Sequence, residues 1–183
     1  SLSADRKKVT LQIPGLQAGR VVHIRSPRPF TSQSGTQLWS TEAWYTLNSM
    51  VGGPPASVTY EAERAARSGG AGVNTDHTGY EGTGFVDGYQ RVGAATTFKV
   101  NVRTAGTYNV DLRYSNGPNP SPGTKSVSVY VNGTKIRQTS LASTGTWDQW
   151  AVQPEWLALN AGANTITYQF DTGDVGHVNL DNI

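Results

Sequence analysis

Cysteine is missing from this chain of 183 residues, and methionine occurs only once. The absence of cysteine excludes disulfide bonds, thiolate nucleophiles and thiolate metal sites, but it leaves the cellular compartment open. Long apolar runs are missing as well, since no stretch approaches the roughly 20 residues of a membrane-spanning helix. We therefore expect a soluble domain that has no membrane partner and whose export signal was removed or lay upstream.

Concentrated charge and helical periodicity are also absent. The formal net charge is only +2 and the basic residues are scattered, which makes nucleic acid a poor candidate for a partner. No segment keeps the apolar spacing of an amphipathic helix. Glycine is abundant at 21 residues, and valine and threonine are frequent, so we predict an all-β fold.

Motifs of common catalytic sites are not found either. The three histidines do not belong to a His-Glu-x-x-His pattern, and the chain contains no Gly-x-Ser-x-Gly motif. We therefore predict no catalytic residues. The two carboxylates of a glycosidase meet in space rather than in sequence, so a small glycosidase or polysaccharide lyase stays open as an alternative.

Residues 51–57 combine two glycines with two prolines and are typical of a linker between folded units. Before this linker, residues 9–13 and 20–25 alternate like the two strands of a β-hairpin. One hairpin cannot bury a core of its own. We therefore interpret residues 1–50 as an N-terminal extension, formed by the closing strands of an upstream domain or by a segment that packs on the second half.

Residues 58–183 contain short strand candidates between turn signals, which favours a jelly-roll β-sandwich. Asn132-Gly133 lies between two alternating segments and is a strong signal for a two-residue hairpin turn. The predicted strands cover residues 58–62, 84–86, 94–102, 107–114, 126–131, 135–140, 150–159, 164–170 and 178–183. The predicted fold class is thus an all-β jelly-roll sandwich with an N-terminal β-hairpin extension.

Two closely spaced glutamates, Glu61 and Glu63, predict a cation site. Alternate side chains of an extended strand share a face, so these carboxylates would repel each other. Calcium, with six to eight oxygen ligands, would relieve the repulsion, and Asp181 could join if the first and last strands lie side by side. Alternatively, both glutamates are solvated or matched by Arg64 and Arg67, and the spacing alone leaves both interpretations open.

Ordered motifs run from residue 60 to the end of the chain. They are Tyr60-Glu61-Ala62-Glu63, Asn74-Thr75-Asp76-His77-Thr78-Gly79-Tyr80, Gly82-Thr83-Gly84-Phe85-Val86-Asp87-Gly88-Tyr89, Arg113-Tyr114-Ser115-Asn116-Gly117, Val129-Tyr130-Val131-Asn132-Gly133 and Asn179-Leu180-Asp181-Asn182-Ile183. Together, in this order, they are specific, and the region resembles the family 35 carbohydrate-binding modules. Those modules are jelly-roll relatives of family 6 modules and are appended to secreted polysaccharide-degrading enzymes.

The resemblance implies a structural calcium ion between the first and last strands. Its implied ligands are Glu61, Glu63 and Asp181, with a backbone carbonyl near Thr83 completing the set. This implication agrees with the repulsion expected between the two glutamates.

The resemblance also implies a sugar site at the loop rim. Some members bind a second calcium ion there, which bridges to a uronic acid, and others bind neutral galactose- or mannose-type sugars. A sugar lays its apolar face on an aromatic ring and offers its hydroxyls to polar side chains. The residues assigned to the rim are Asn74 and Asp76 for the second ion, Tyr80, Asn116, Trp147 and Trp150 around the sugar, and Arg91 for the charge of an acidic sugar.

Two tryptophans are interpreted from their local context. Trp147 stands in a loop sequence, so exposure and burial are equally open for it. Trp156 lies between Glu155 and Leu157 in a predicted strand, and we expect it in the core.

We therefore expect a non-catalytic, calcium-dependent carbohydrate-binding module that targets a secreted enzyme to polysaccharide. Uronic-acid-containing polysaccharide is among the expected ligands. The expected partners are a polysaccharide or oligosaccharide and a covalently linked catalytic domain upstream. Besides the enzyme alternative, a structural spacer whose calcium only stiffens the fold also stays open.

Overall fold

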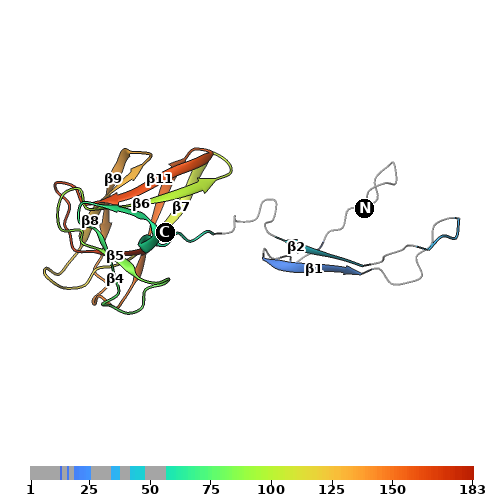
Figure 1. Ribbon diagram of the computed structural model, residues 1–183, viewed down its shortest axis with the longest axis horizontal. Helices are drawn as coiled ribbons and strands as arrows, with labels where there is room; N and C mark the ends of the chain where they lie inside the picture. The colour runs from blue at the N-terminus through green and yellow to red at the C-terminus, as the bar shows by residue number, and fades with distance from the viewer. Residues whose placement is uncertain (1–12, 14–15, 17–18, 26–33, 38–41, 48–56) are drawn as a thin grey trace. The chain divides into compact units, whose positions relative to one another are not determined.

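The structure is a computed structural model that describes residues 13, 16, 19–25, 34–37, 42–47 and 57–183. It divides into two units, residues 1–58 and residues 59–183, which are described separately below (Figure 1). The predicted linker at residues 51–57 lies outside the described residues except for Ser57. In the described part of the chain, no helix has the length and apolar character that crossing a membrane requires.

The described part of the first unit contains a two-stranded antiparallel sheet. Strand β1 (Arg20–Arg25) pairs with β2 (Glu42–Leu47), so that Arg20 lies opposite Leu47 and Arg25 opposite Glu42. The predicted partner of β1 was residues 9–13. Of these, only Ile13 is described, and it is not part of a strand. The pairing with β2 was not foreseen, because the two strands are separated by a long connection.

The second unit is a β-sandwich, as predicted. One five-stranded sheet has the order β10-β7-β12-β5-β4, and the other has the order β3-β6-β11-β8-β9. All strand pairs in both sheets are antiparallel. The strands are β3 (Ala66–Ser68), β4 (Gly72–Asn74), β5 (Phe85–Asp87), β6 (Ala95–Val102), β7 (Gly106–Ser115), β8 (Lys125–Val131), β9 (Thr134–Leu141), β10 (Ala151–Leu159), β11 (Gly162–Gln169) and β12 (Asn179–Asn182).

The turn chemistry read from the sequence is present where it was predicted. Asn132 and Gly133 both have positive φ, at 50° and 79°, and they connect β8 to β9 with Val131 opposite Thr134. A two-residue turn with positive φ at both positions matches the right-handed twist of the strands that it joins.

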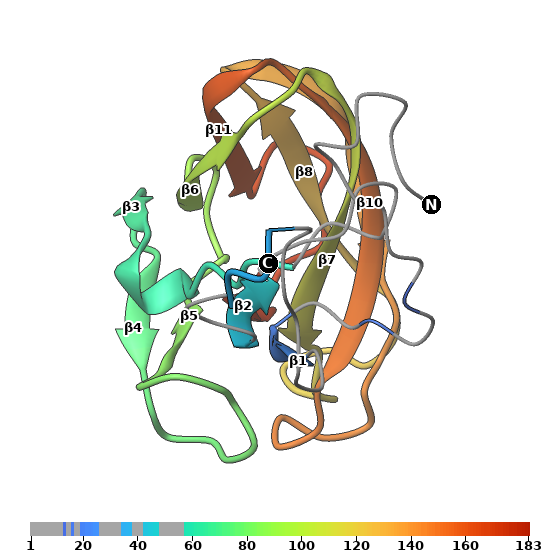
Figure 2. The same cartoon turned by 90° about the vertical axis from the view of Figure 1, so that its right-hand side faces the viewer.

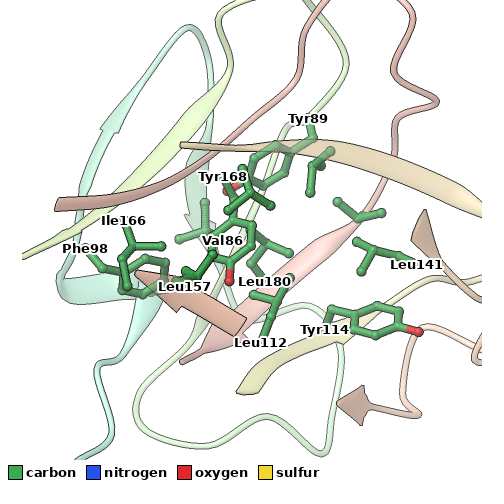
Figure 3. Close-up of a cluster of buried hydrophobic side chains, with 14 of the residues drawn as sticks. Val86, Tyr89, Phe98, Leu112, Tyr114, Leu141, Leu157, Ile166, Tyr168 and Leu180 are labelled. Atoms are coloured by element: carbon green, nitrogen blue, oxygen red, sulfur yellow. The ribbon is translucent and has the colours of Figure 1, made fainter. Parts of the chain in front are cut away.

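The core lies between the two sheets and consists of side chains that alternate along the strands. Val86 and Leu180 from one sheet and Phe98, Ile166 and Tyr168 from the other are at most 1% exposed. Figure 3 shows these side chains turned toward one another between the strands. Burial of this apolar surface is the main term that holds the two sheets together.

The first and last segments of the unit lie side by side, as predicted. The backbones of Tyr60 and Ile183 exchange two hydrogen bonds, at 2.9 and 3.1 Å, and Glu61 bridges to Asn182. The predicted strand at residues 58–62 is wrong, however. Only this isolated bridge forms, and a 3-10 turn, η1 (Ala62–Arg64), follows it directly. The short strands β3 and β4 were not predicted, because each contains only one apolar side chain, Ala66 or Val73.

Trp156 is not in the core, and the expectation that it would be buried is wrong. Its side chain is 64% exposed, whereas its neighbours Glu155 and Leu157 are each 1% exposed. Because side chains alternate along a strand, the burial of Glu155 turns Trp156 outward. Glu155 is accommodated inside by an ion pair with Arg137. Strand β10 lies at the edge of its sheet, beside β7 (Figure 2).

Candidate functional site

Two neighbouring groups of side chains gather on the loops of the sandwich, and the first is acidic. It joins Glu61 and Glu63 from the first segment, Glu81 from the long loop between β4 and β5 (residues 75–84), and Asp181 from β12. Gly82 lies among the carboxylates: its φ is +67°, and a Cβ atom placed there would be 3.1 Å from Oε2 of Glu61 and would overlap Oε1 of Glu63. A glycine at this position therefore lets both glutamates approach the loop backbone.

Hydrogen bonds hold the loop onto these carboxylates. Thr83 donates to Oε1 of Glu63 from its backbone N–H at 2.9 Å and from its hydroxyl at 3.1 Å. The backbone N–H of Glu81 donates to Asp181 at 3.0 Å, and the amide of Asn182 donates to Oε2 of Glu81 at 3.1 Å. The acidic cluster thus connects the two chain ends of the sandwich to residues 81–83.

The cluster has more buried negative charge than its neighbours neutralise. Oε2 of Glu61 and Oε2 of Glu63 are both buried and accept no hydrogen bond. Burial raises the pKa of Glu61, and the nearby charges of Glu63, Asp181 and Glu81 raise it further. Burial also raises the pKa of Asp181, against the opposing effect of hydrogen bonds from the Glu81 amide and Arg113. Such a group of partly buried, unpaired carboxylate oxygens is typical of a site that holds a cation.

Neither Arg64 nor Arg67 pairs with the two glutamates within the described residues. Arg67 donates to the backbone carbonyls of Glu63 and Ala65, each at 2.8 Å. Neither the solvated arrangement nor the arginine-matched arrangement therefore accounts for the two buried oxygens.

Asp181, unlike the two glutamates, is paired with a positively charged side chain. Its carboxylate forms an ion pair with Arg113, whose guanidinium also donates to the backbone carbonyl of Gly79 at 2.8 Å. Within the described ranges, no three His, Cys, Asp or Glu side chains are arranged to hold a metal ion together. The donor set of Glu61 and Glu63, all oxygen, fits a hard cation. The calcium ion and its ligation by Glu61, Glu63, Asp181 and a carbonyl near Thr83 all stay predictions.

The second group of side chains is aromatic. Its rings are contributed by the long loop, by β5, and by the loop that leads into β10. The ring of His77 stacks between Phe85 and Trp147, with both centroid distances at 5.8 Å. Phe85 in turn contacts Trp150 at 5.5 Å and Tyr80 at 5.7 Å. We call these five residues the ring cluster.

The two loops of the ring cluster are joined by direct hydrogen bonds. Asp148 accepts from the backbone N–H of Thr78 at 2.7 Å and from its hydroxyl at 3.1 Å, and Trp150 donates from its indole N–H to the Thr78 carbonyl at 2.8 Å. These hydrogen bonds from Thr78 lower the pKa of Asp148, and the nearby charge of His77 adds to the effect. The rings are thus placed by loops that hold each other in position.

Trp147 is half-buried, and its ring contacts Gly117 and Lys125. Gly117 lies directly beneath its ring, because a Cβ atom there would be 2.5 to 2.6 Å from three of the indole carbons. Nζ of Lys125 lies 4.8 Å from the ring centroid and donates to the Gly117 carbonyl at 3.0 Å. Lys125 is 1% exposed, and its burial lowers its pKa. The cation–π contact and the flat glycine backbone together orient the indole.

The remaining residues assigned to the rim have different surroundings. Asn116 is fully buried and donates to the carbonyls of Gly123 and Leu141, both at 2.9 Å, so it supports the loops under the rings. Arg91 is exposed and lies beside Gly70, and no described contact connects it to the ring cluster.

Asn74, the last residue of β4, and Asp76, in the loop that follows it, are the residues assigned to a second ion. The Asn74 amide donates to Asp87 at 2.9 Å, and its oxygen accepts from the backbone N–H groups of Thr75 and Asp76 at 2.7 and 3.2 Å. Both lone pairs of that oxygen are therefore used inside the loop. The Asp76 side chain is 60% exposed, with Oδ1 at 3.8 Å from Nε2 of His77. The second ion stays a prediction.

The site also uses residues that sequence reasoning did not assign. Phe85 lies in a strand, β5, as predicted, but the place of its ring in the ring cluster rather than in the core between the sheets was not predicted. Lys125 contacts the ring of Trp147, and Asp148 accepts hydrogen bonds from Thr78. Both partners are distant in sequence, so no local pattern predicts these contacts. Arg113 was quoted within a motif, but its position beside Trp150, at 5.2 Å from the ring, was not anticipated.

Comparisons with known proteins identify the family of this chain. A family profile described as "Carbohydrate binding module (family 35)" matches residues 58–183. A 1,6-alpha-glucosyltransferase from Sporosarcina globispora is 52% identical over 131 residues, which cover 68% of this chain and 10% of that protein. The chain thus spans only about a tenth of the length of that curated relative.

Solved structures give the same result. A family 35 carbohydrate-binding module from Paenibacillus barcinonensis superposes with a TM-score of 0.62 and 32% identity, over 69% of this chain and 95% of that one. A cycloisomaltooligosaccharide glucanotransferase from Paenibacillus sp., complexed with cycloisomaltoheptaose, matches with a TM-score of 0.64 and 32% identity, over 68% of this chain and 17% of that one.

Proposed function

The chain belongs to family 35 of the carbohydrate-binding modules, and from that membership we propose that residues 58–183 bind a neutral gluco-oligosaccharide on the ring cluster. The similar enzymes include one named for 1,6-alpha-glucosyl transfer and one seen with a cyclic isomalto-oligosaccharide, so the proposed ligand is an α-1,6-linked glucan.

The observation that carries this proposal is the geometry of Trp147. Its indole is half-buried and contacts Gly117, Lys125 and the stacked ring of His77, which fix the ring before any ligand arrives. A fixed aromatic ring offers the apolar face of a sugar a stacking surface at little cost in side-chain entropy. Asp76 and Asp148, both more than half exposed, supply carboxylate acceptors for hydroxyl groups near the rings.

A neutral sugar suits this rim better than a uronic acid. The exposed carboxylates of Asp76 and Asp148 lie near the rings and would repel an acidic sugar. A second calcium ion would have to offset that repulsion, but the Asn74 oxygen is already satisfied within its loop. Uronic acids are therefore the competing ligand class, and the experiment below separates the two.

We further propose that the acidic cluster holds a calcium ion, with Glu61 and Glu63 as ligands and Asp181 and a carbonyl near Thr83 completing the set. The support is the pair of buried carboxylate oxygens that accept no hydrogen bond. A bound calcium ion would neutralise their charge. The same carboxylates hold residues 81–83, so the ion would stabilise the loop that continues into the ring cluster.

In the full-length protein we propose that the module is secreted and covalently linked to an upstream catalytic domain, which it targets to polysaccharide. The support is that its similar enzymes carry the matching region as a small part of a larger chain. The competing function, hydrolysis or elimination by the chain itself, would release reducing ends or unsaturated products from glucan or polyuronate.

Isothermal titration calorimetry of the chain with isomaltotriose tests the proposal directly. We expect heat of binding from the wild type and a roughly tenfold or larger loss of affinity in Trp147→Ala. Trp44→Ala is the matched control, because Trp44 is an exposed tryptophan in the other unit. No heat with isomaltotriose, together with calcium-dependent heat with glucuronic acid, would reject the neutral-glucan proposal.

A further inference from the structure

A second exposed aromatic surface begins beside the ring cluster and follows β10. The outward side chains of this strand are Val152, Pro154, Trp156 and Ala158, all of them exposed and none of them charged. Trp156 is 64% exposed and Val152 is 55% exposed, in a sandwich whose other large aromatic residues are at least half buried. A contiguous row of exposed apolar side chains such as this one, rather than a single exposed residue, indicates a surface that another molecule covers.

Neighbouring strand β7 adds polar groups to the same face. In the register of the two strands, Val152 lies opposite Arg113, Pro154 opposite Asp111, and Trp156 opposite Asn109. Directly opposed residues of an antiparallel pair share a face, so amide and carboxylate groups flank the apolar row. The Asn109 amide donates to Asp111 at 2.9 Å, which orients both planar groups. We call this surface, formed by Val152, Pro154, Trp156, Ala158, Thr107, Asn109 and Asp111, the β10 face.

The β10 face is continuous with the ring cluster. Arg113 lies opposite Val152 at one end of the row, and its guanidinium lies 5.2 Å from the ring of Trp150. A strand rises about 3.3 Å per residue, so Trp156 stands roughly 13 Å farther along the strand than Val152. A ligand chain that leaves the ring cluster along β10 would therefore reach a second indole.

The chemistry of the face favours a glycan chain over a protein strand or a second copy. Pro154 lacks the N–H that an added strand would need, and an edge strand that contains proline resists pairing. The face has seven residues, whereas a stable protein interface uses about 20–30 residues on each side. An exposed indole flanked by planar amide and carboxylate groups is the surface that the apolar face and the hydroxyls of a sugar require.

We propose that the β10 face is an additional glucan-binding subsite, at which Trp156 stacks on a sugar unit of a chain whose end is held in the ring cluster. This inference rests on the proposed binding of glucan by the ring cluster. It makes the site an extended one: a short oligosaccharide fills the ring cluster alone, and a long chain also reaches Trp156.

Two ligands of different length test the inference in the 183-residue chain. Isomaltotriose and a linear isomalto-oligosaccharide long enough to reach from Trp150 to Trp156 are titrated into the wild type, Trp156→Ala and Trp156→Phe. We expect Trp156→Ala to bind the long ligand roughly three- to tenfold more weakly and isomaltotriose with unchanged affinity. Trp156→Phe, which keeps an aromatic ring, should retain most of the affinity for the long ligand. Ile136→Ala, at an exposed apolar residue of the other sheet, is the matched control.

The outcomes separate this inference from the proposed function. If the wild type binds isomaltotriose and Trp156→Ala loses nothing on the long ligand, the β10 face is refuted and the ring cluster stands. An equal loss on both ligands, in a variant with an unchanged melting curve, would also refute a separate subsite. A wild type that self-associates through Trp156 in sedimentation velocity would assign the face to a second copy instead. A wild type that binds neither ligand would refute the proposed function itself.

Discussion

Replacing Glu61 with glutamine is predicted to have opposite effects on stability with and without calcium. Without calcium, the Glu61 carboxylate is partly buried beside Glu63, Asp181 and Glu81, and one of its oxygens accepts no hydrogen bond. Glutamine removes the charge while keeping the size of the side chain. With calcium, the same change removes a proposed ligand. The sign of the effect therefore reports whether the acidic cluster holds an ion.

The magnitude follows from the burial of the carboxylate. A buried polar group without a partner costs about 1–3 kcal/mol, and because Glu61 is only partly buried we expect Glu61→Gln to recover about 1 kcal/mol without calcium. For a domain of this size that is an increase of roughly 4 °C in melting temperature. Calcium at a hundredfold excess over its dissociation constant should stabilise the wild type by about 2.7 kcal/mol, or roughly 10 °C, and the variant much less.

The pH dependence of the calcium-free protein provides a second measure of the same repulsion. Because the pKa of Glu61 is raised on folding, the folded state holds this proton more tightly than the unfolded state. The ionised Glu61 carboxylate lowers the free energy of unfolding. This loss of stability is fully present above the raised pKa and disappears as the pH falls through it. The wild type in chelator should therefore gain stability relative to Glu61→Gln on mild acidification.

Differential scanning fluorimetry in chelator and in calcium measures all of these effects. Asp111→Asn removes an exposed carboxylate outside the cluster and serves as the control, with an unchanged response to calcium. The reasoning is refuted if calcium leaves the melting temperature of the wild type unchanged and Glu61→Gln melts lower than the wild type in chelator.

Two further substitutions test the ring cluster and the fold. Gly117→Ala would place a methyl group 2.5 Å from the indole of Trp147 and displace the ring. We therefore expect this variant to bind isomaltotriose roughly tenfold more weakly in calorimetry. The control variant Gly106→Ala, whose added methyl group meets nothing closer than 4.0 Å, should bind isomaltotriose normally. Burial would raise the pKa of Asp171, but hydrogen bonds, first of all from Lys135, outweigh it and hold the pKa well below its ordinary range. This stabilisation is present at neutral pH and is lost as the pH falls, so Asp171→Asn should lower the free energy of unfolding by about 1 kcal/mol in urea at neutral pH and by less at acidic pH. An equal loss at both pH values would contradict that assignment.

Long strands and turns of the sandwich could be predicted from the sequence, because their alternation and turn residues act locally. The Asn132-Gly133 turn and β6 to β11 are where the pattern placed them, within one or two residues. The prediction of a strand at residues 58–62 is wrong, because Glu61 forms only a single β-bridge before the 3-10 turn η1 begins. The prediction of a buried Trp156 fails because Glu155 is buried and forms an ion pair with Arg137. Side chains alternate along the strand, so Trp156 points outward.

The candidate site could be predicted only in part. Glu61 and Glu63 converge as their charge pattern indicated, although through a bridge and a 3-10 turn rather than through one strand. The support of Trp147 by Gly117 and Lys125 was not predictable, since the three residues meet only when β8 and the loops around it are in place. Long-range contacts of this kind depend on the tertiary fold and leave no local pattern.

The most direct measurement of the central claim is the response of the five indole N–H resonances to isomaltotriose in a two-dimensional NMR titration. Binding on the ring cluster predicts that the signals of Trp147 and Trp150, assigned by substitution, shift together with one dissociation constant while that of Trp156 stays in place. Saturation of the protein with isomaltotriose without any shift of Trp147 would contradict the account.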